Sequence, residues 1–272
     1  MMDDTREKVH LVAEQETLLI TLYSKTFGSP PGWFSDPAAW KIVEAIDYDF
    51  SKLKVKTGTR LTVCLRAMKI DREIRTFLQA APDGVVLHLG CGLDTRFDRV
   101  DNGRVRWYDL DLPEAIELRR KLFNESERYR MIASSVTDWA WMSQVNTHGQ
   151  PAFIAAEGLM MYLKPEEVKE LVLRLQGAFP GGRLVFDAFS GFTARNVYRN
   201  PSLRKTGAVI QWGIDDPHEI ERWAPGIHLN EEWTFDQAEE IAQLSSGYRL
   251  MFWISGLFAV ARKAHRILDF TL

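Results

Sequence analysis

The sequence contains little cysteine. Only Cys64 and Cys91 occur among its 272 residues, and this excludes the disulfide framework on which small secreted domains depend. Cys91 also stands between two glycines of a loop, where a structural disulfide would restrict the backbone. We therefore expect a reducing, cytoplasmic location.

The chain also lacks long apolar runs and extended basic runs. Its longest apolar stretch, LMFWISGLFAVA at residues 250–261, is shorter than the roughly 20 residues of a membrane-spanning helix. The start of the chain, MMDDTREKVH, carries two early acids and does not resemble a signal peptide. The formal net charge of −3 argues against a general binder of nucleic acid or anionic membrane, which needs a basic surface. We expect neither as a partner.

What is present is the composition of a globular protein, with 46% hydrophobic and 26% charged residues. Residues 1–80 show helical periodicity, as in LTVCLRAMKIDREIRTFLQAA. After Val85, short apolar runs such as GVVLHLG and PAFIAAEG alternate with helical patterns such as LPEAIELRRKLF. This alternation predicts a parallel sheet covered by helices on both faces. We expect a single domain over residues 1–272, with residues 1–80 as a helical cover.

The C-terminal third departs from the alternation in two ways. The runs YRLMFWI and LFAVARK flank Ser255-Gly256 and predict a hairpin, which would make the last strand antiparallel to the others. Residues 190–235 contain Trp212, Trp223 and Trp233 among charged residues, and they predict an insert between the fifth and sixth strands. The tryptophans could form a lid over an aromatic acceptor or could anchor the insert to the domain.

A glycine loop follows the first predicted strand in VVLHLGCGLDTRFDRV, residues 85–100. Such a loop, beyond the carboxyl end of a parallel strand, lets the backbone approach a ligand closely. The next strand ends in Asp109 and Asp111, where an acid can bind ribose hydroxyls or cap the following helix. Dinucleotides and S-adenosylmethionine (SAM) both fit this unit. Thr95 stands where the dinucleotide fingerprint has its third glycine, and this favours SAM.

Four segments, VVLHLGCGLDTRFDRVD, VRWYDLDLPEAIELRRKLF, AAEGLMMYL and WGIDDPHEIERWAPGIHL, resemble the family of leucine carboxyl methyltransferases and tetracenomycin-type polyketide O-methyltransferases. The resemblance extends from about Leu18 to the C-terminus. It implies a Rossmann-like α/β class I methyltransferase fold with a seven-stranded, mostly parallel sheet, an antiparallel last strand, the N-terminal helical cover and the insert at 190–235.

The resemblance also implies a set of cofactor contacts. Lys25 and Arg66 would bind the methionine carboxylate of SAM, and Glu157 or Asp94 its ammonium group. The glycine loop would lie against the cofactor. The full set is Lys25, Arg66, Gly90, Gly92, Asp94, Asp111 (ribose), Ser135 and Val136 (adenine) and Glu157.

Two positions depart from the family pattern. Many methyltransferases have an acid where this chain has His88, two residues before the first loop glycine. In addition, SVTD at 135–138 replaces the DLRD of the protein-methylating branch, so the contact of an aspartate with the adenine amino group is lost or passes to Asp138.

These observations predict a SAM-dependent O-methyltransferase that acts on a small aromatic or polyketide-like acceptor and uses no metal. A phenol acceptor would gain from a base, for which His218 in the insert is the candidate, with His228 as a second. His10, His148 and His265 carry no signal. The alternatives are methylation of a protein C-terminal carboxylate, a non-catalytic SAM-binding protein and, last, a nicotinamide oxidoreductase. The sequence leaves the oligomeric state open.

Overall fold

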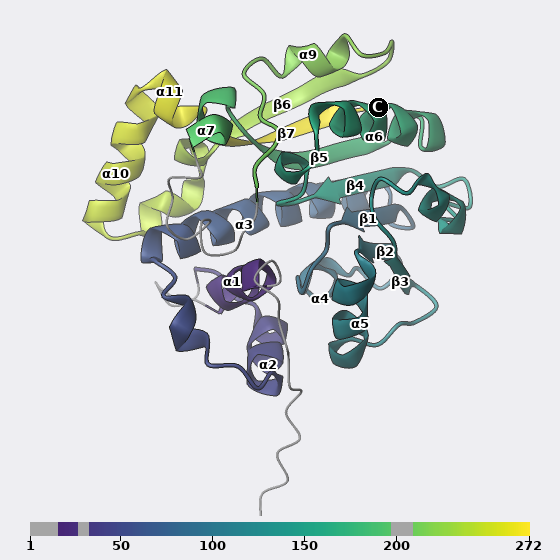
Figure 1. Ribbon diagram of the computed structural model, residues 1–272, viewed down its shortest axis with the longest axis horizontal. Helices are drawn as coiled ribbons and strands as arrows, with labels where there is room; N and C mark the ends of the chain where they lie inside the picture. The colour runs from purple at the N-terminus through teal and green to yellow at the C-terminus, as the bar shows by residue number, and fades with distance from the viewer. Residues whose placement is uncertain (1–15, 27–32, 197–208) are drawn as a thin grey trace, which may run out of the picture.

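A seven-stranded sheet runs through the computed structural model of the chain, which describes residues 16–26, 33–196 and 209–272 (Figure 1). In sheet order the strands are β3 (Tyr129–Ala133), β2 (Arg106–Asp111), β1 (Val85–Leu89), β4 (Ala152–Ala156), β5 (Arg183–Phe189), β7 (His265–Thr271) and β6 (His228–Thr234). Strands β1 to β5 are parallel, whereas β7 is antiparallel to both β5 and β6. The expected α/β class with an antiparallel last strand is confirmed.

Helices cover both faces of the sheet, as Figure 1 shows. On one face lie α3 (Thr57–Ala80), α4 (Arg96–Val100) and α5 (Pro113–Leu122), and on the other lies α6 (Pro165–Ala178). The remaining elements are α1 (Glu16–Lys25), α2 (Pro37–Ala45), η2 (Phe50–Leu53), η3 (Trp139–Gln144), η4 (Met160–Tyr162), α7 (Gly191–Asn196), α9 (His218–Glu221), η6 (Phe235–Gln237), η7 (Glu239–Gln243), α10 (Ser246–Leu257) and α11 (Ala259–Arg262). No helix in the described ranges has both the length and the apolarity to cross a bilayer.

The central strands are apolar because they are buried on both faces. Every residue of β1 (VVLHL) and β4 (AFIAA) is buried. Helix α6 begins where the sequence indicates, at Pro165, and the Glu167 carboxylate accepts a hydrogen bond of 2.8 Å from the backbone N–H of Lys164. Parallel strands end at one edge of a sheet, so the residues that follow β1, β2 and β4 meet there.

The prediction of a hairpin at residues 248–263 is wrong. These residues form the helices α10 and α11, and the antiparallel pair consists instead of β6 and β7. A continuous apolar run such as LMFWI carries no period that distinguishes a strand from a helix. Strand β6 lies within the segment assigned to the insert, so the connection from β5 to β6 ends before His228.

Two tryptophans of the insert pack against the apolar cluster on the α6 face. Trp212 is 7% exposed, and its ring centroid lies 6.1 Å from that of Phe186. Trp223 is partly buried against the same cluster. Trp233 belongs to β6 and is buried on the opposite face. Residues 197–208 of the expected insert lie outside the described residues.

Candidate active site

A cavity of about 610 Å³ lies at the edge where the parallel strands end. Its walls come from α1, α3, the glycine loop after β1, the turn after β4, η4, the end of β5, α7, α10 and the first residue of β7. Five of the residues predicted from the sequence line it, namely Arg66, Gly90, Gly92, Asp94 and Glu157. This volume lies within the range of small-molecule sites.

The glycine loop needs its glycines. Gly90 and Gly92 have φ angles of +65° and +50°, and a Cβ atom on Gly92 would come within 2.8 Å of the Leu18 side chain. The backbone N–H of Gly92 donates a hydrogen bond of 2.7 Å to the Asp111 carboxylate. This bond ties the loop after β1 to the end of β2, and the second oxygen of Asp111 accepts the Leu112 N–H at 2.8 Å.

A network of buried charges lies beside the loop. Arg66 on α3 binds Glu157 through Nε at 3.0 Å and Asp187 through Nη1 at 2.7 Å. Arg96 contacts the other oxygen of Glu157. Lys25 at the end of α1 pairs with Asp94 at 2.7 Å. Buried carboxylates and cations thus neutralise one another, as buried charges must.

The network keeps its carboxylates ionised. Burial by itself would raise the pKa of Glu157, but Lys25, Arg96 and Arg66 lower that pKa to about 2. Burial also opposes the ionisation of Asp94, but Arg96, Arg99 and Lys25 outweigh it and hold the pKa of Asp94 well below its usual range. The cavity therefore presents fixed negative charge next to guanidinium groups.

His88 takes part in this network instead of replacing the missing acid. Its Nε2 lies 3.1 Å from Nη1 of Arg96, and its Nδ1 lies 3.2 Å from the Asp109 carboxylate. Asp109 is fully buried and also binds Arg119 and Trp107. Of the two acids that end β2, Asp109 is thus a core residue, and Asp111 is the one at the sheet edge.

The structure does not bring every predicted residue to the cavity. Ser135 forms a 2.8 Å hydrogen bond with Thr137, and Val136 is buried in the apolar cluster on the α6 face. Asp138, the alternative residue for the adenine contact, caps η3. Lys25 and Asp111 do not line the cavity, but each contacts a residue that does, Asp94 and Gly92 respectively.

His218 lies away from the cavity. Its side chain is 63% exposed and pairs with Glu221 one turn along α9, at 2.6 Å. His228 is also exposed, at the start of β6. The expectation that His218 acts as a base is therefore not supported by its position, because a base must lie within hydrogen-bond reach of the proton that it removes.

Sequence reasoning missed the part of the cavity beyond Arg66 and Glu157. That part is formed by side chains from η4, β5, α7, α10 and β7: Met161, Tyr162, Phe189, Thr193, Met251 and His265. The misassigned hairpin concealed His265 and Met251. A strand start placed at His265, antiparallel to β5, would have put this histidine at the sheet edge.

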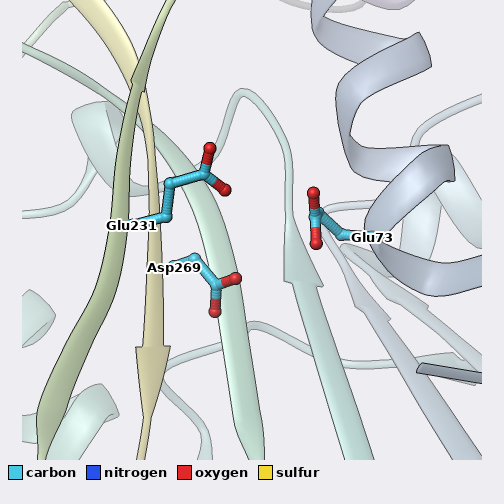
Figure 2. A group of neighbouring side chains, drawn as sticks. All are labelled: Glu73, Glu231 and Asp269. Atoms are coloured by element: carbon cyan, nitrogen blue, oxygen red, sulfur yellow. The ribbon is translucent and has the colours of Figure 1, made fainter. Parts of the chain in front are cut away.

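One other group of acids has a structural role. Glu73 on α3 faces Glu231 on β6 and Asp269 on β7 (Figure 2). Lys69 binds Glu73 at 2.7 Å and Glu231 at 2.6 Å, and Arg183 binds Asp269 through Nε at 2.9 Å. These ion pairs join α3 to the antiparallel end of the sheet.

The donor set at the cavity fits SAM. Glu157 offers a carboxylate for an ammonium group, and Nη2 of Arg66 makes no hydrogen bond to the described residues, which leaves it for a carboxylate. The loop glycines present backbone, and each Asp111 oxygen keeps a lone pair for a ribose hydroxyl. Sheet order, loop and donor set define the class of SAM-dependent methyltransferases.

Comparisons with known proteins agree with this class. The family model of leucine carboxyl methyltransferase matches residues 26–176. The tetracenomycin polyketide synthesis O-methyltransferase TcmP of Streptomyces glaucescens is 36% identical over 97% of this chain and 99% of its own length. The SAM-dependent methyltransferase dpfgK of Gibberella zeae is 34% identical over 82% of this chain and 83% of its own.

A solved structure supports the fold. A protein of the DUF574 family from Streptomyces avermitilis superposes with a TM-score of 0.61 at 14% identity, over 96% of this chain and 99% of its own. The chain belongs to the leucine carboxyl methyltransferase family. It is a SAM-dependent methyltransferase.

Proposed function

We propose that this enzyme transfers the methyl group of SAM to an oxygen atom of a small aromatic or polyketide-like acceptor. The observation that carries the proposal is the apolar wall of the cavity beyond Arg66 and Glu157, where Met161, Phe189 and Met251 face the space. Aromatic and thioether side chains suit a flat apolar ligand. The name of the relative TcmP, a polyketide synthesis O-methyltransferase, agrees with such an acceptor.

The proposal assigns one end of the cavity to the cofactor. Arg66 would bind the methionine carboxylate and Glu157 the ammonium group, with Lys25 and Asp94 supporting them as a buried pair. The ribose would lie at Asp111. The adenine would lie beyond it near Ser135 and Val136, because the Ser134 N–H binds the Asp111 carbonyl at 2.9 Å and so places the end of β3 beside Asp111.

When bound, SAM supplies a methyl group already activated by a sulfonium. The chain has to hold the acceptor oxygen in line with that group and to exclude water. The packed walls from α1 and α10 serve both tasks.

Transfer of radiolabelled methyl from SAM tests the proposal. Hydroxylated naphthalenes and anthraquinones, naphthoic acid and a peptide ending in leucine serve as acceptors. We expect label on the aromatic compounds and none on the peptide. Mild alkali releases methanol from an ester but not from an aryl ether, so it also identifies the oxygen. Label on the peptide alone would overturn the proposal in favour of protein carboxyl methylation.

A pair of variants on α10 tests the acceptor wall. Met251 and Leu250 are neighbours of similar exposure, but only Met251 lines the cavity. We expect Met251→Ala to raise the KM of an aromatic acceptor while leaving SAM affinity unchanged. Leu250→Ala should change neither. Equal effects of the two substitutions would show that the acceptor does not contact this wall.

A further inference from the structure

Helix α10 is apolar on the faces that point away from its own chain. All 12 of its residues, Ser246–Leu257, are described, and of these only Phe252 is buried. Its other large apolar side chains are 44–62% exposed: Leu250, Met251, Trp253, Ile254 and Leu257. A helix that is apolar all round is normally buried, so α10 calls for a second contact surface.

Four of these side chains share one face of α10, because a spacing of i, i+3, i+4 and i+7 places them in a single stripe: Leu250, Trp253, Ile254 and Leu257. Phe258 and Val260, which are 62% and 71% exposed, follow at the turn into α11 and within α11. These six residues form the α10–α11 patch. Figure 1 shows α10 and α11 together at one end of the molecule.

The patch is large enough for a stable protein interface. A fully buried aromatic side chain covers about 150–250 Å², so six large side chains that are 44–71% exposed present several hundred Å² of apolar surface. Monomeric proteins rarely expose a contiguous apolar patch of that size. A standard interface buries about 800 Å² on each partner, and the patch supplies most of that area.

The charges around the patch favour a second copy of this chain as the partner. Arg262 is exposed in α11, beyond the end of α10, and Glu239 is exposed in η7, which packs against α10 from its N-terminal side. When two α10 helices pack antiparallel about a two-fold axis, the α11 end of each lies against the η7 end of the other. Arg262 then approaches the second copy's Glu239. The positive end of each helix also lies beside the negative end of the other.

A membrane surface fits the patch less well. Helices that lie in a membrane interface carry a strongly charged face opposite their apolar one. Helix α10 has a single charged residue, Arg249, and its remaining polar positions are serine, glycine and tyrosine. An isologous interface, in contrast, needs only one patch that matches itself.

We propose that the chain forms a two-fold symmetric homodimer through the α10–α11 patch, with the two α10 helices antiparallel. The patch is held in place before the copies meet, because a Cβ atom on Gly256 would come within 2.9 Å of Asp236 and α10 therefore lies close against η6. Such preorganisation lowers the cost of association. The second copy covers the helix whose Met251 lines the cavity. The association does not depend on which acceptor the enzyme methylates.

The oligomeric state of the full chain tests the inference. Analytical ultracentrifugation should show a dimer at micromolar concentration. Trp253→Glu combined with Leu257→Glu would bury charges without partners at the centre of the interface, and should leave a monomer that still binds SAM. Trp40→Glu is the matched control, because Trp40 is also 50% exposed but lies on α2. This control should remain a dimer.

A cysteine substitution tests the antiparallel arrangement without added charge. The middle of the stripe lies at the two-fold axis, so Trp253→Cys places two thiols close together and should give a disulfide between the copies under mild oxidation. Trp40→Cys should not be cross-linked. Cys64 and Cys91 are buried and should not react in the folded chain.

The outcomes decide between partners. A wild-type chain that stays monomeric up to its solubility limit overturns the inference, and if that monomer cosediments with phosphatidylglycerol vesicles, the patch is assigned to a membrane surface instead. A dimer that survives the double substitution at Trp253 and Leu257, or one that Trp40→Glu dissociates, also overturns it. If the double variant does not fold, the cross-link at Trp253→Cys decides: its formation supports the dimer and its absence overturns it.

Discussion

Arg66 links the two ends of the cavity. Its Nε binds Glu157 at the proposed cofactor end, and its Nη1 binds Asp187, which in turn binds His265 at the proposed acceptor end. Burial opposes the charge of this guanidinium, but Asp187 and Glu157 raise its pKa above the usual value, so it stays charged. A planar group with five donors can bind two carboxylates and still offer hydrogens to a third, which a lysine ammonium cannot match in geometry.

Replacing Arg66 should therefore affect both binding and stability. Arg66→Ala should weaken SAM binding by about 1.5–3 kcal/mol, the range for hydrogen bonds to charged groups. It should also destabilise the fold by about 3–5 kcal/mol, because two buried carboxylates lose their partner. Arg66→Lys should recover part of both. Calorimetry measures the binding and urea unfolding the stability.

Arg174→Ala is the control for Arg66, because its pair with Glu170 is half-exposed and such pairs contribute little. Unchanged SAM affinity in Arg66→Ala would reduce Arg66 to a purely structural role.

The sequence was informative about single residues whose chemistry follows directly from their place after a strand. Gly90, Asp111 and Glu157 each follow or end a parallel strand, so strand order alone brings them to one edge. His265 could not be found in this way. Its place at the cavity depends on pairing with the strand that holds Asp187, 78 residues earlier in the chain, and no local sequence pattern predicts this antiparallel register.

Among the elements around the site, those with a clear period were predictable and those without one were not. The buried runs of β1 and β4 and the capped start of α6 follow from local rules. Helix α10 does not, because its apolar residues cover both its buried and its exposed faces, as Phe252 and Trp253 show. Strand β6 was missed because HLNEEWT has three polar residues in succession, Asn230 to Glu232, and only then its tryptophan and threonine.

The described residues from 209 to the start of β6 are attached to the sheet, and their tryptophans do not line the cavity. Trp212 is buried against Phe186, and the Arg266 guanidinium of β7 donates a 3.1 Å hydrogen bond to the Asp215 carbonyl. None of Trp212, Trp223 and Trp233 lines the described cavity. The interpretation of the tryptophans as anchors is thereby favoured over that of a lid.

Trp212→Ala should then destabilise the protein by about 3–5 kcal/mol, as truncation of a buried aromatic does. Trp223→Ala should destabilise it less, because Trp223 is only partly buried. Neither should raise the acceptor KM in the folded enzyme. Urea unfolding measures the stability of each variant. Kinetics at urea concentrations below the unfolding transition measure the KM of the acceptor. A raised KM with an unchanged unfolding midpoint would restore the lid.

The buried charge network makes the stability of the protein depend on acid pH. The pKa of Glu157 falls from an ordinary 4.5 to about 2 on folding, and Asp94 and Asp187 are lowered as well. A carboxylate whose folded pKa is depressed stabilises the fold above its unfolded pKa. That stability is lost as the pH falls toward the folded value.

We therefore expect the urea midpoint to fall steeply between about pH 5 and pH 2. Glu157→Gln should lower the midpoint at pH 7 and make the fall at acid pH shallower, because one linked proton is removed. Glu170→Gln, at an exposed pair, should leave the curve unchanged. A wild-type midpoint that stays level down to pH 3 would contradict the ionised network.

Binding of SAM should stabilise the folded chain as a whole, because the proposed contacts come from segments far apart in the sequence. Arg66, Gly90, Asp111 and Glu157 lie on α3, after β1, at the end of β2 and after β4, and they meet only in the folded sheet. A ligand that binds only the folded state at about a hundred times its Kd adds roughly 2.7 kcal/mol to the free energy of unfolding. The demethylated product shares these contacts and should act similarly. NAD should not stabilise the chain, because the loop has a threonine at the position of the third glycine of the dinucleotide fingerprint.

Thermal melts with each ligand measure the effect, and Arg66→Ala should reduce the shift caused by SAM. A melt that responds to NAD and ignores both SAM and its product would contradict the cofactor assignment.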